Sequence, residues 1–261
     1  MAVVTGAGRG FGRAIAVRLA ARGYTVLATD VHAEAAGATA ELVGGLPMAL
    51  DVRDPDAHRA AARAAAERGP LEVWVNNAGV MRTVKCWEQT DDEVRLECEV
   101  NLLGVIWGSR AAVDAMRAGP GDAHIINLAS MSALQPVPGL AVYAATKHAV
   151  LGFSGSLQGD LLDAGIPITV HAICPDGADT QLVREHDDEP EAAIIWSGRR
   201  LLTVDEVADE AVALLDSKKL VHVVPRWRGW GARANAMAGR TGLRTAPLLR
   251  RAGERRRARA G

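Results

Sequence analysis

The 261-residue chain has few cysteines, few aromatic residues and no long apolar run. Its three cysteines, Cys86, Cys98 and Cys174, show no paired spacing, which favours a reducing compartment over a disulfide framework and provides no metal-binding motif. No stretch reaches the roughly 18 uninterrupted apolar residues that a transmembrane helix needs. Aromatic residues make up only 4% of the chain but hydrophobic residues make up 49%, so disorder of the whole chain is excluded.

No targeting segment is expected at the start of the chain. Residues 1–4 lead directly into a glycine-rich turn, which leaves no room for a charged leader and an apolar signal segment. The sequence therefore predicts a cytoplasmic protein. Its length suits one large α/β domain, because small residues supply much of the apolar content and allow helices to pack closely on a sheet.

Short apolar runs alternate along the chain with longer segments of helical periodicity. The expected strands cover Ala2–Thr5, Thr25–Thr29, Pro47–Leu50, Leu71–Asn76, Ala123–Leu128, Ile168–Cys174 and Leu220–Val224. The expected helices lie near Arg9–Arg22, Ala33–Leu42, Pro55–Arg68, Asp91–Arg117 and Val142–Ala164, and a further helix opens at the capping box Thr203–Glu206. This alternation predicts an α/β fold of Rossmann type with a doubly wound parallel sheet, which binds ligands beyond the carboxyl ends of its strands.

The predicted domain covers residues 1–225, and a basic extension covers residues 226–261. Within the domain, residues 176–202 break the α/β rhythm with a polar, turn-rich stretch followed by a short apolar one. Such an insertion beside the strand ends is expected to form a substrate lid. A solvated surface excursion is the alternative.

A glycine-rich turn, TGAGRGFG, follows the first expected strand and opens the first expected helix. This context indicates a dinucleotide site: Gly6 permits the turn, Gly10 lets the backbone approach a phosphate, and Gly12 allows the helix to pack closely on the strand. Arg9 and Phe11 lie in the same turn. The N-terminus of the helix then offers amide groups and a positive dipole to the pyrophosphate.

Asp30 ends the second expected strand, where its carboxylate can accept hydrogen bonds from the adenosine ribose hydroxyls and would repel a 2′-phosphate. This favours NAD over NADP. Arg9 argues in the other direction, because a guanidinium beside the turn could pair with that phosphate. We give Asp30 more weight because it lies closer to the discriminating hydroxyl.

A proton-transfer site is indicated by Tyr143 and Lys147, with Ser130 upstream. Residues four apart lie on one face of a helix, so the ammonium group can stabilise the ionised phenol. A cation about 4 Å away at an effective dielectric constant near 20 contributes roughly 4 kcal/mol, on the order of three pKa units. The sequence therefore predicts that the pKa of Tyr143 is lowered from about 10 into the range useful for catalysis.

These features occur in one order: the glycine turn, Asn77-Ala78-Gly79, Asn101, Ser130 and Tyr143-x-x-x-Lys147. Together they resemble the short-chain dehydrogenase/reductase family over roughly residues 1–225. The resemblance implies a single Rossmann-type domain with a seven-stranded parallel sheet, NAD(P)-dependent oxidoreductase activity, and assembly into tetramers or dimers.

The resemblance also implies roles for individual residues. Tyr143 would be the acid/base, Lys147 would lower its pKa and hold the nicotinamide ribose, and Ser130 would bind the substrate oxygen. Asn101 would hold a water that leads to the lysine. The remaining implied cofactor contacts are Asp51 and Val52 at the adenine ring, and Asn77, Ala78 and Gly79 in the turn after the fourth strand.

The turn after the sixth expected strand departs from the family pattern. The family commonly has Pro-Gly there, whereas this chain has Pro175-Asp176-Gly177 ahead of Thr180. We expect Pro175, Gly177 and Thr180 to contact the cofactor. In one arrangement, Asp176 accepts a hydrogen bond from the nicotinamide carboxamide. In the alternative, the turn is shifted and Gly177 makes the close approach to the nicotinamide.

The expected substrate pocket has a mainly apolar wall near the catalytic serine. Such a wall predicts a lipophilic secondary alcohol or ketone as substrate. An alternative is a nucleotide-binding regulatory protein of the same fold without turnover, which would not need the serine, tyrosine and lysine together. The expected wall residues are Met81, Leu134, Val137, Pro138 and Trp196.

The extension after residue 225 carries eleven arginines and one acidic residue, although the whole chain has a formal net charge of only −1. Its tryptophans and leucines could make it a basic amphipathic segment on a membrane surface, across a subunit boundary or over the substrate cleft. A partly disordered, solubilising end is the alternative. Nucleic-acid binding is not expected, because the arginines come without aromatic platforms or a recognised reading motif.

Overall fold

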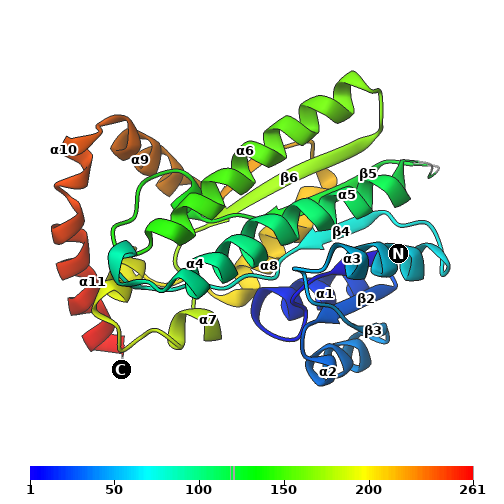
Figure 1. The fold of residues 1–261 in the computed structure, drawn as a ribbon, viewed down its shortest axis with the longest axis horizontal. Coiled ribbons are helices and arrows are strands. Elements are labelled where there is room, and N and C mark those ends of the chain that lie inside the picture. The colour runs from blue at the N-terminus through cyan, green and yellow to red at the C-terminus, as the bar shows by residue number, and fades with distance from the viewer. Residues whose placement is uncertain (118, 120, 261) are drawn as a thin grey trace.

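The computed structural model describes residues 1–117, 119 and 121–260 and shows a parallel sheet between two layers of helices (Figure 1). Its strands are β1 (Ala2–Val4), β2 (Val26–Asp30), β3 (Leu46–Ala49), β4 (Val73–Asn76), β5 (Ala123–Leu128), β6 (Ile168–Pro175) and β7 (Val221–Val224). All pairings are parallel, in the order β3-β2-β1-β4-β5-β6-β7. The strand order reverses between β1 and β4, which places a ligand crevice at their carboxyl ends. The predicted doubly wound, seven-stranded sheet is confirmed.

Helices cover both faces of the sheet. Apolar residues of α1, α2 and α8 pack on one face, and those of α3, α5 and α6 pack on the other. Because both faces are covered, six of the seven strands are mostly buried and largely apolar, whereas the edge strand β3 is partly exposed along its length. The helices are α1 (Gly10–Ala21), α2 (Ala33–Val43), α3 (Pro55–Ala66), α4 (Asp91–Cys98), α5 (Gly104–Met116), α6 (Ala141–Asp163), α7 (Gln181–Arg184), α8 (Val204–Ala213), α9 (Arg226–Met237), α10 (Arg240–Leu243) and α11 (Ala246–Ala260). Short 3-10 segments are η1 (Cys86–Glu88), η3 (Met131–Ala133), η4 (Pro190–Ser197) and η5 (Leu214–Asp216).

Side-chain caps fix where several helices begin. The predicted capping box at Thr203 is present: its hydroxyl accepts from the Glu206 amide at 3.1 Å, and the Glu206 carboxylate accepts from the Thr203 amide at 2.8 Å. A second capping box opens α4 at Thr90. Each box satisfies amide groups that the first helical turn leaves without a partner.

The segment expected as one helix over residues 91–117 is instead two helices joined by a π-helical turn, η2 (Glu99–Leu103). This turn contains Asn101, whose fully buried side chain accepts from the Val80 amide at 2.9 Å and donates to the Val80 carbonyl at 2.8 Å. The wider turn aims Asn101 at the loop after β4. Such turns are frequent at functional sites.

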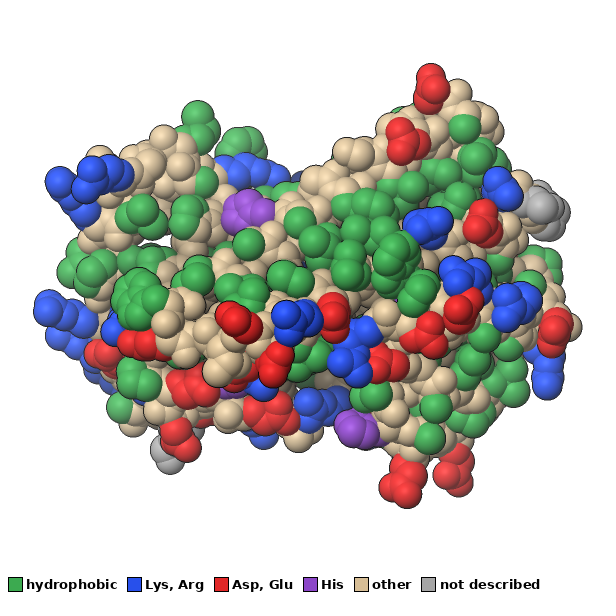
Figure 2. Space-filling model, viewed as in Figure 1, with side chains coloured by type: hydrophobic (Ala, Val, Ile, Leu, Met, Phe, Trp, Pro, Cys, Tyr) green, Lys and Arg blue, Asp and Glu red, His purple; other side chains and the backbone are tan. Residues whose placement is uncertain are grey.

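The last three helices, α9 to α11, lie together at one end of the molecule, and α11 packs along η4 (Figure 1). Apolar side chains gather over α5 and α6, while charges of both signs occupy much of the rest of that view (Figure 2). Among the described residues, none of the helices combines the length and the apolar character needed to cross a membrane.

Candidate active site

Two adjoining cavities open at the carboxyl ends of the strands. One of about 630 Å³ lies along the glycine-rich turn (the turn cavity), and one of about 490 Å³ lies over Ser130 (the Ser130 cavity). They form one continuous cleft, because six residues line both: Phe11, Ala129, Tyr143, Pro175, Thr180 and Leu182.

The glycine-rich turn connects β1 to α1 and forms a cradle of backbone. Gly6 and Gly10 have φ angles of 60° and 53°, the left-handed region that favours glycine. A Cβ at Gly12 would lie 2.2 Å from the Gly6 carbonyl oxygen, so the close packing of helix on turn requires glycine there. Gly6, Arg9, Gly10 and Phe11 line the turn cavity. The cradle at the N-terminus of α1 fits the pyrophosphate of a dinucleotide.

Asp30 and Arg9 both line the turn cavity. The Asp30 carboxylate accepts hydrogen bonds from the Gly8 amide at 2.9 Å and the His32 amide at 3.0 Å, so it is held at the rim of the turn cavity. The Arg9 guanidinium lies 2.7 Å from the Glu185 carboxylate on the segment after α7. The charge that argued for NADP is thus paired with a carboxylate in this structure.

The loops after β3 and β4 supply the other side of the turn cavity. Asn77 fastens the β4 loop to the glycine-rich turn, because its amide donates to the Thr5 hydroxyl at 3.0 Å and its side chain donates to the Gly6 carbonyl at 3.0 Å. The expected cofactor residues of these loops all line the cavity: Asp51, Val52, Asn77, Ala78 and Gly79.

Asn101 lines neither cavity, although it was expected to take part in the site directly. Its contacts with Val80 hold the loop that carries Gly79, and its side chain also donates to the Thr146 hydroxyl at 3.5 Å. It therefore links the β4 loop to the helix that carries Lys147.

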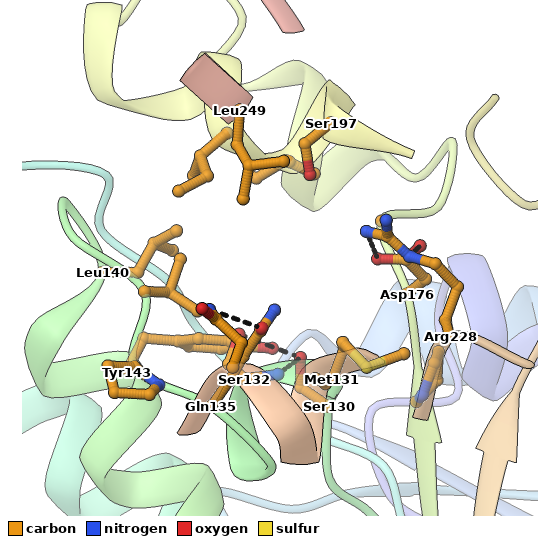
Figure 3. A pocket seen from close by; sticks show the side chains of 18 of the residues that line it. Ser130, Met131, Ser132, Gln135, Leu140, Tyr143, Asp176, Ser197, Arg228 and Leu249 are labelled. Carbon is orange, nitrogen blue, oxygen red and sulfur yellow. Dashed lines mark hydrogen bonds and ion pairs between the residues drawn. The ribbon is translucent and has the colours of Figure 1, made fainter. Parts of the chain in front are cut away.

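Ser130, Tyr143 and Lys147 come together where the two cavities meet. Ser130 follows β5, and its hydroxyl accepts from the Ser132 amide at 3.1 Å. Tyr143 and Lys147 lie one turn apart on α6, with the Lys147 ammonium 5.6 Å from the centre of the Tyr143 ring. Lys147 is 4% exposed and donates to the Leu128 carbonyl at 2.8 Å. Figure 3 shows the Ser130 and Tyr143 side chains side by side beneath the Ser130 cavity.

The expected lowering of the tyrosine pKa is wrong for this structure. Burial raises the pKa of Tyr143 to about 12, although its hydrogen bond with Ser130 acts in the opposite direction. Burial also lowers the pKa of Lys147 to about 8. Both shifts have one cause, because loss of water disfavours the charged form of each group. The phenol is therefore protonated at neutral pH and suited to donate a proton.

Asp176 makes an ion pair that the sequence did not suggest. Its carboxylate lies 2.7 Å from Nε of Arg228 on α9 and accepts from Nη2 of the same residue at 3.2 Å. Only 14% of the Asp176 side chain and 20% of the Arg228 side chain are exposed. The carboxylate that was expected to be available to the nicotinamide carboxamide is thus engaged by the C-terminal extension.

The rest of this turn divides between the two cavities. Pro175 and Thr180 line both, as expected for cofactor contacts. Gly177 lines only the Ser130 cavity, and a Cβ there would lie 2.4 Å from the Ile195 carbonyl oxygen. Its glycine therefore admits the predicted lid segment, which differs from the close approach to cofactor that the sequence suggested.

The residues expected in the substrate wall lie in different environments in the structure. Met81, Val137 and Pro138 line the Ser130 cavity. Leu134 does not, because it packs into the core cluster that contains Val150 and Val223. Trp196 is also absent from the wall, and its indole N–H donates to the Asp187 carboxylate at 3.3 Å. Its neighbours Ile194, Ile195 and Ser197 take that place.

Sequence reasoning did not name the wall residues that belong to the C-terminal extension. Trp227, Arg228, Leu243 and Leu249 line the Ser130 cavity. Their apolar spacing was visible in the sequence, and cover of the substrate cleft was one of the positions considered. The final residue of the predicted extension, Gly261, lies outside the described residues. No group of metal-ligating side chains occurs in the part of the chain that the structure describes.

The sequence profile of the family described as short chain dehydrogenase matches residues 1–191. The 3-oxoacyl-(acyl-carrier-protein) reductase FabG of Escherichia coli (strain K12) is 35% identical over 228 residues, which are 85% of this chain and 92% of that protein. The 1-deoxy-11-beta-hydroxypentalenate dehydrogenase of Streptomyces avermitilis is 35% identical over 226 residues, covering 84% of this chain and 82% of that protein.

Two solved structures share the fold. A short chain dehydrogenase/reductase from Burkholderia phymatum in complex with NAD has a TM-score of 0.80 and 28% identity, covering 89% of this chain and 91% of that one. The 3-ketoacyl-(acyl-carrier-protein) reductase from Brucella melitensis complexed with NADH has a TM-score of 0.76 and 30% identity, covering 85% and 95%. The chain belongs to the short-chain dehydrogenase/reductase family and is an NAD(P)-dependent oxidoreductase that acts on CH–OH groups.

Proposed function

We propose that this enzyme interconverts a lipophilic secondary alcohol and its ketone, with Tyr143 as the acid/base. The observation that carries the proposal is that Tyr143 lines both the turn cavity and the Ser130 cavity. Its side chain is therefore shared by the space that suits a dinucleotide and the space that suits a substrate. The mainly apolar wall of the Ser130 cavity supports a lipophilic substrate.

A reduced nicotinamide held by the residues of the turn cavity would supply the hydride for reduction of the carbonyl carbon. Tyr143 donates its proton to the carbonyl oxygen, which its raised pKa allows because the phenol is protonated at neutral pH. The Ser130 hydroxyl donates a hydrogen bond to the same oxygen, and the charge on Lys147 stabilises the phenolate that remains. Oxidation runs through the same steps in reverse, so the phenolate then takes the proton of the alcohol.

We further propose NAD as the preferred cofactor. Asp30 lines the turn cavity at the end of β2, where a carboxylate favours ribose hydroxyls and repels a 2′-phosphate. The pairing of Arg9 with Glu185 engages the guanidinium that favoured NADP and so weakens that argument. The NAD and NADH bound in the two structural relatives agree with this choice.

The test is a panel of secondary alcohols and ketones followed at the nicotinamide absorbance, with NAD and NADP in parallel. We expect turnover of apolar substrates, a lower KM for NAD, and loss of nearly all turnover in Tyr143→Phe with the dissociation constant for NADH unchanged. Nucleotide binding without turnover of any member of the panel would reject the enzymatic proposal in favour of a regulatory protein.

The remaining expectations stay predictions. A homo-oligomer is supported by the apolar side chains gathered over α5 and α6 (Figure 2), and light scattering after size exclusion would test it. A cytoplasmic location, a catalytic domain over residues 1–225 and membrane contact through residues 226–261 also remain to be tested. Liposome co-sedimentation of the full chain addresses the last of these.

A further inference from the structure

The C-terminal extension forms a wall of the Ser130 cavity, and it lies outside the residues that the family profile matches. Trp227 and Arg228 of α9 contribute to one side, while Leu243 and Leu249 contribute from α10 and α11. Figure 3 shows Leu249 on the opposite side of the cavity from Ser130. A substrate over the serine would therefore meet these residues at its far end.

Helix α11 is fastened to η4 by three arginines. Arg250 forms an ion pair with Glu191, whose side chain is only 11% exposed. Arg256 donates to the Ser197 carbonyl at 2.7 Å, and Arg257 donates to the Glu189 carbonyl at 3.0 Å. The basic run near the chain end thus satisfies specific acceptors instead of facing only water.

A glycine sets how closely the two segments approach. A Cβ at Gly253 on α11 would lie 1.8 Å from the carbonyl oxygen of Ala193 in η4. Backbone therefore touches backbone at this point, and even a methyl group would push the helix away. Gly159 on α6, by contrast, has no atom within 4 Å of its equivalent Cβ position.

A second fastening joins the extension to the walls nearest the reacting groups. The ion pair of Asp176 with Arg228 ties α9 to the turn after β6. Asn235 donates to the Gln135 side chain at 3.3 Å, which ties α9 to the segment after Ser130. The Arg228 charge on the cavity wall is matched by Asp176, so the cavity presents no unpaired charge from this pair to a substrate.

We propose that residues 226–259 form a fixed roof that sets the maximum length of the substrate, so that the enzyme accepts an uncharged, compact, lipophilic alcohol or ketone in free form. The same reactive group on a long chain or carried by an acyl-carrier protein is excluded by the roof. This inference rests on the proposed function. It separates the chain from relatives whose names specify a carrier-bound substrate.

The experiment compares Gly253→Ala with Gly159→Ala, using 2-alkanones of increasing length and a 3-oxoacyl group on acyl-carrier protein as probes. In the wild-type enzyme kcat/KM should fall steeply once the chain reaches the roof, because one methylene too many in an apolar pocket costs roughly tenfold or more. Gly253→Ala should move that limit to longer chains and raise relative activity on the carrier-bound probe, while Gly159→Ala should leave the limit unchanged. The dissociation constant for NADH should be the same in all three proteins.

Leu249→Trp provides an independent test, because a larger side chain pointing into the cavity should move the limit to shorter chains. Unchanged limits in both Gly253→Ala and Leu249→Trp would overturn the roof, as would equal wild-type activity on free and carrier-bound probes. If the wild type binds NADH but turns over no member of the series, the proposed function fails. The roof is then judged from the length dependence of alkanone binding in thermal-shift titrations, with the same expectations for each variant.

Discussion

Replacing Lys147 by methionine should expose how its charge controls the Tyr143 phenol. The ammonium lies 5.6 Å from the centre of the phenol ring. At an effective dielectric constant near 20, that distance gives a stabilisation of the phenolate of about 3 kcal/mol, or roughly two pKa units. The charged lysine therefore makes this phenol, whose pKa burial raises to about 12, easier to ionise than it is beside a neutral lysine.

The lysine itself loses its proton near its own pKa of about 8. The state with ionised tyrosine and charged lysine contains the same number of protons as the state with neutral tyrosine and neutral lysine, so pH does not change the ratio between these two states. Above the pKa of the lysine, the population of the ionised tyrosine beside charged lysine therefore stops rising. Alcohol oxidation by the wild-type enzyme should therefore rise about tenfold per pH unit and level off near pH 8. Lys147→Met has no such break, and its rate should continue to rise toward the pKa of the phenol.

The resulting deficit of Lys147→Met is about 100-fold in kcat/KM at pH 7 and disappears toward pH 10. Initial rates of alcohol oxidation between about pH 6 and about pH 10 measure it. Lys219→Met, at an exposed lysine, is the matched control and should follow the wild-type profile. A deficit that is the same at every pH would show that Lys147 acts by holding the structure and not through its charge.

Four further predictions follow from single residues. Ser130→Ala should lower kcat/KM by roughly 100-fold with an unchanged dissociation constant for NADH, because it removes a donor to the reacting oxygen; equal losses in NADH binding would point to collapse of the site. Asp30→Ala should reduce the preference for NAD over NADP by roughly tenfold in parallel KM measurements, and an unchanged ratio would remove Asp30 from cofactor selection. Thr203→Ala should lower the melting temperature by about 2–4 °C through loss of a cap worth about 1 kcal/mol. In the folded protein the pKa of Glu206 is held at about 2, below its usual 4.5. Glu206→Gln should therefore lower stability above about pH 4.5, and this difference from the wild type should vanish as the pH falls toward 2; a difference independent of pH would contradict this.

The sheet was predictable because each strand is an apolar run bounded by turn residues, a pattern that depends only on neighbours along the chain. The π-helical turn was not, because the side-chain contacts made within it join Asn101 to Val80, which is remote in sequence. The direction in which a side chain points from an irregular segment could not be predicted from the sequence either. Ile195 and Trp196 are adjacent and both apolar, yet only the first lines the cavity.

The electrostatic error has a different origin. The spacing of Tyr143 and Lys147 correctly places them on one helix face, but it does not show whether that face is buried or exposed to water. Burial is the largest influence on both groups, and it moves the pKa of each in the direction that favours the neutral form. The spacing of two residues therefore predicts that they are neighbours, but their charge states also depend on how deeply the rest of the fold buries them.

The unusual carboxylate at Asp176 is paired with one of the many arginines of the C-terminal extension, Arg228. A half-buried carboxylate at the turn after β6 would be costly without a partner, and Arg228 supplies one from the extension. The same extension places Leu249 over the Ser130 cavity. An Asp176→Gly change toward the common family sequence should therefore weaken the docking of α9 and alter substrate length selection, whereas cofactor affinity should change less. If the principal effect were instead on NADH binding, Asp176 would act on the cofactor and the ion pair would be incidental to the shape of the pocket.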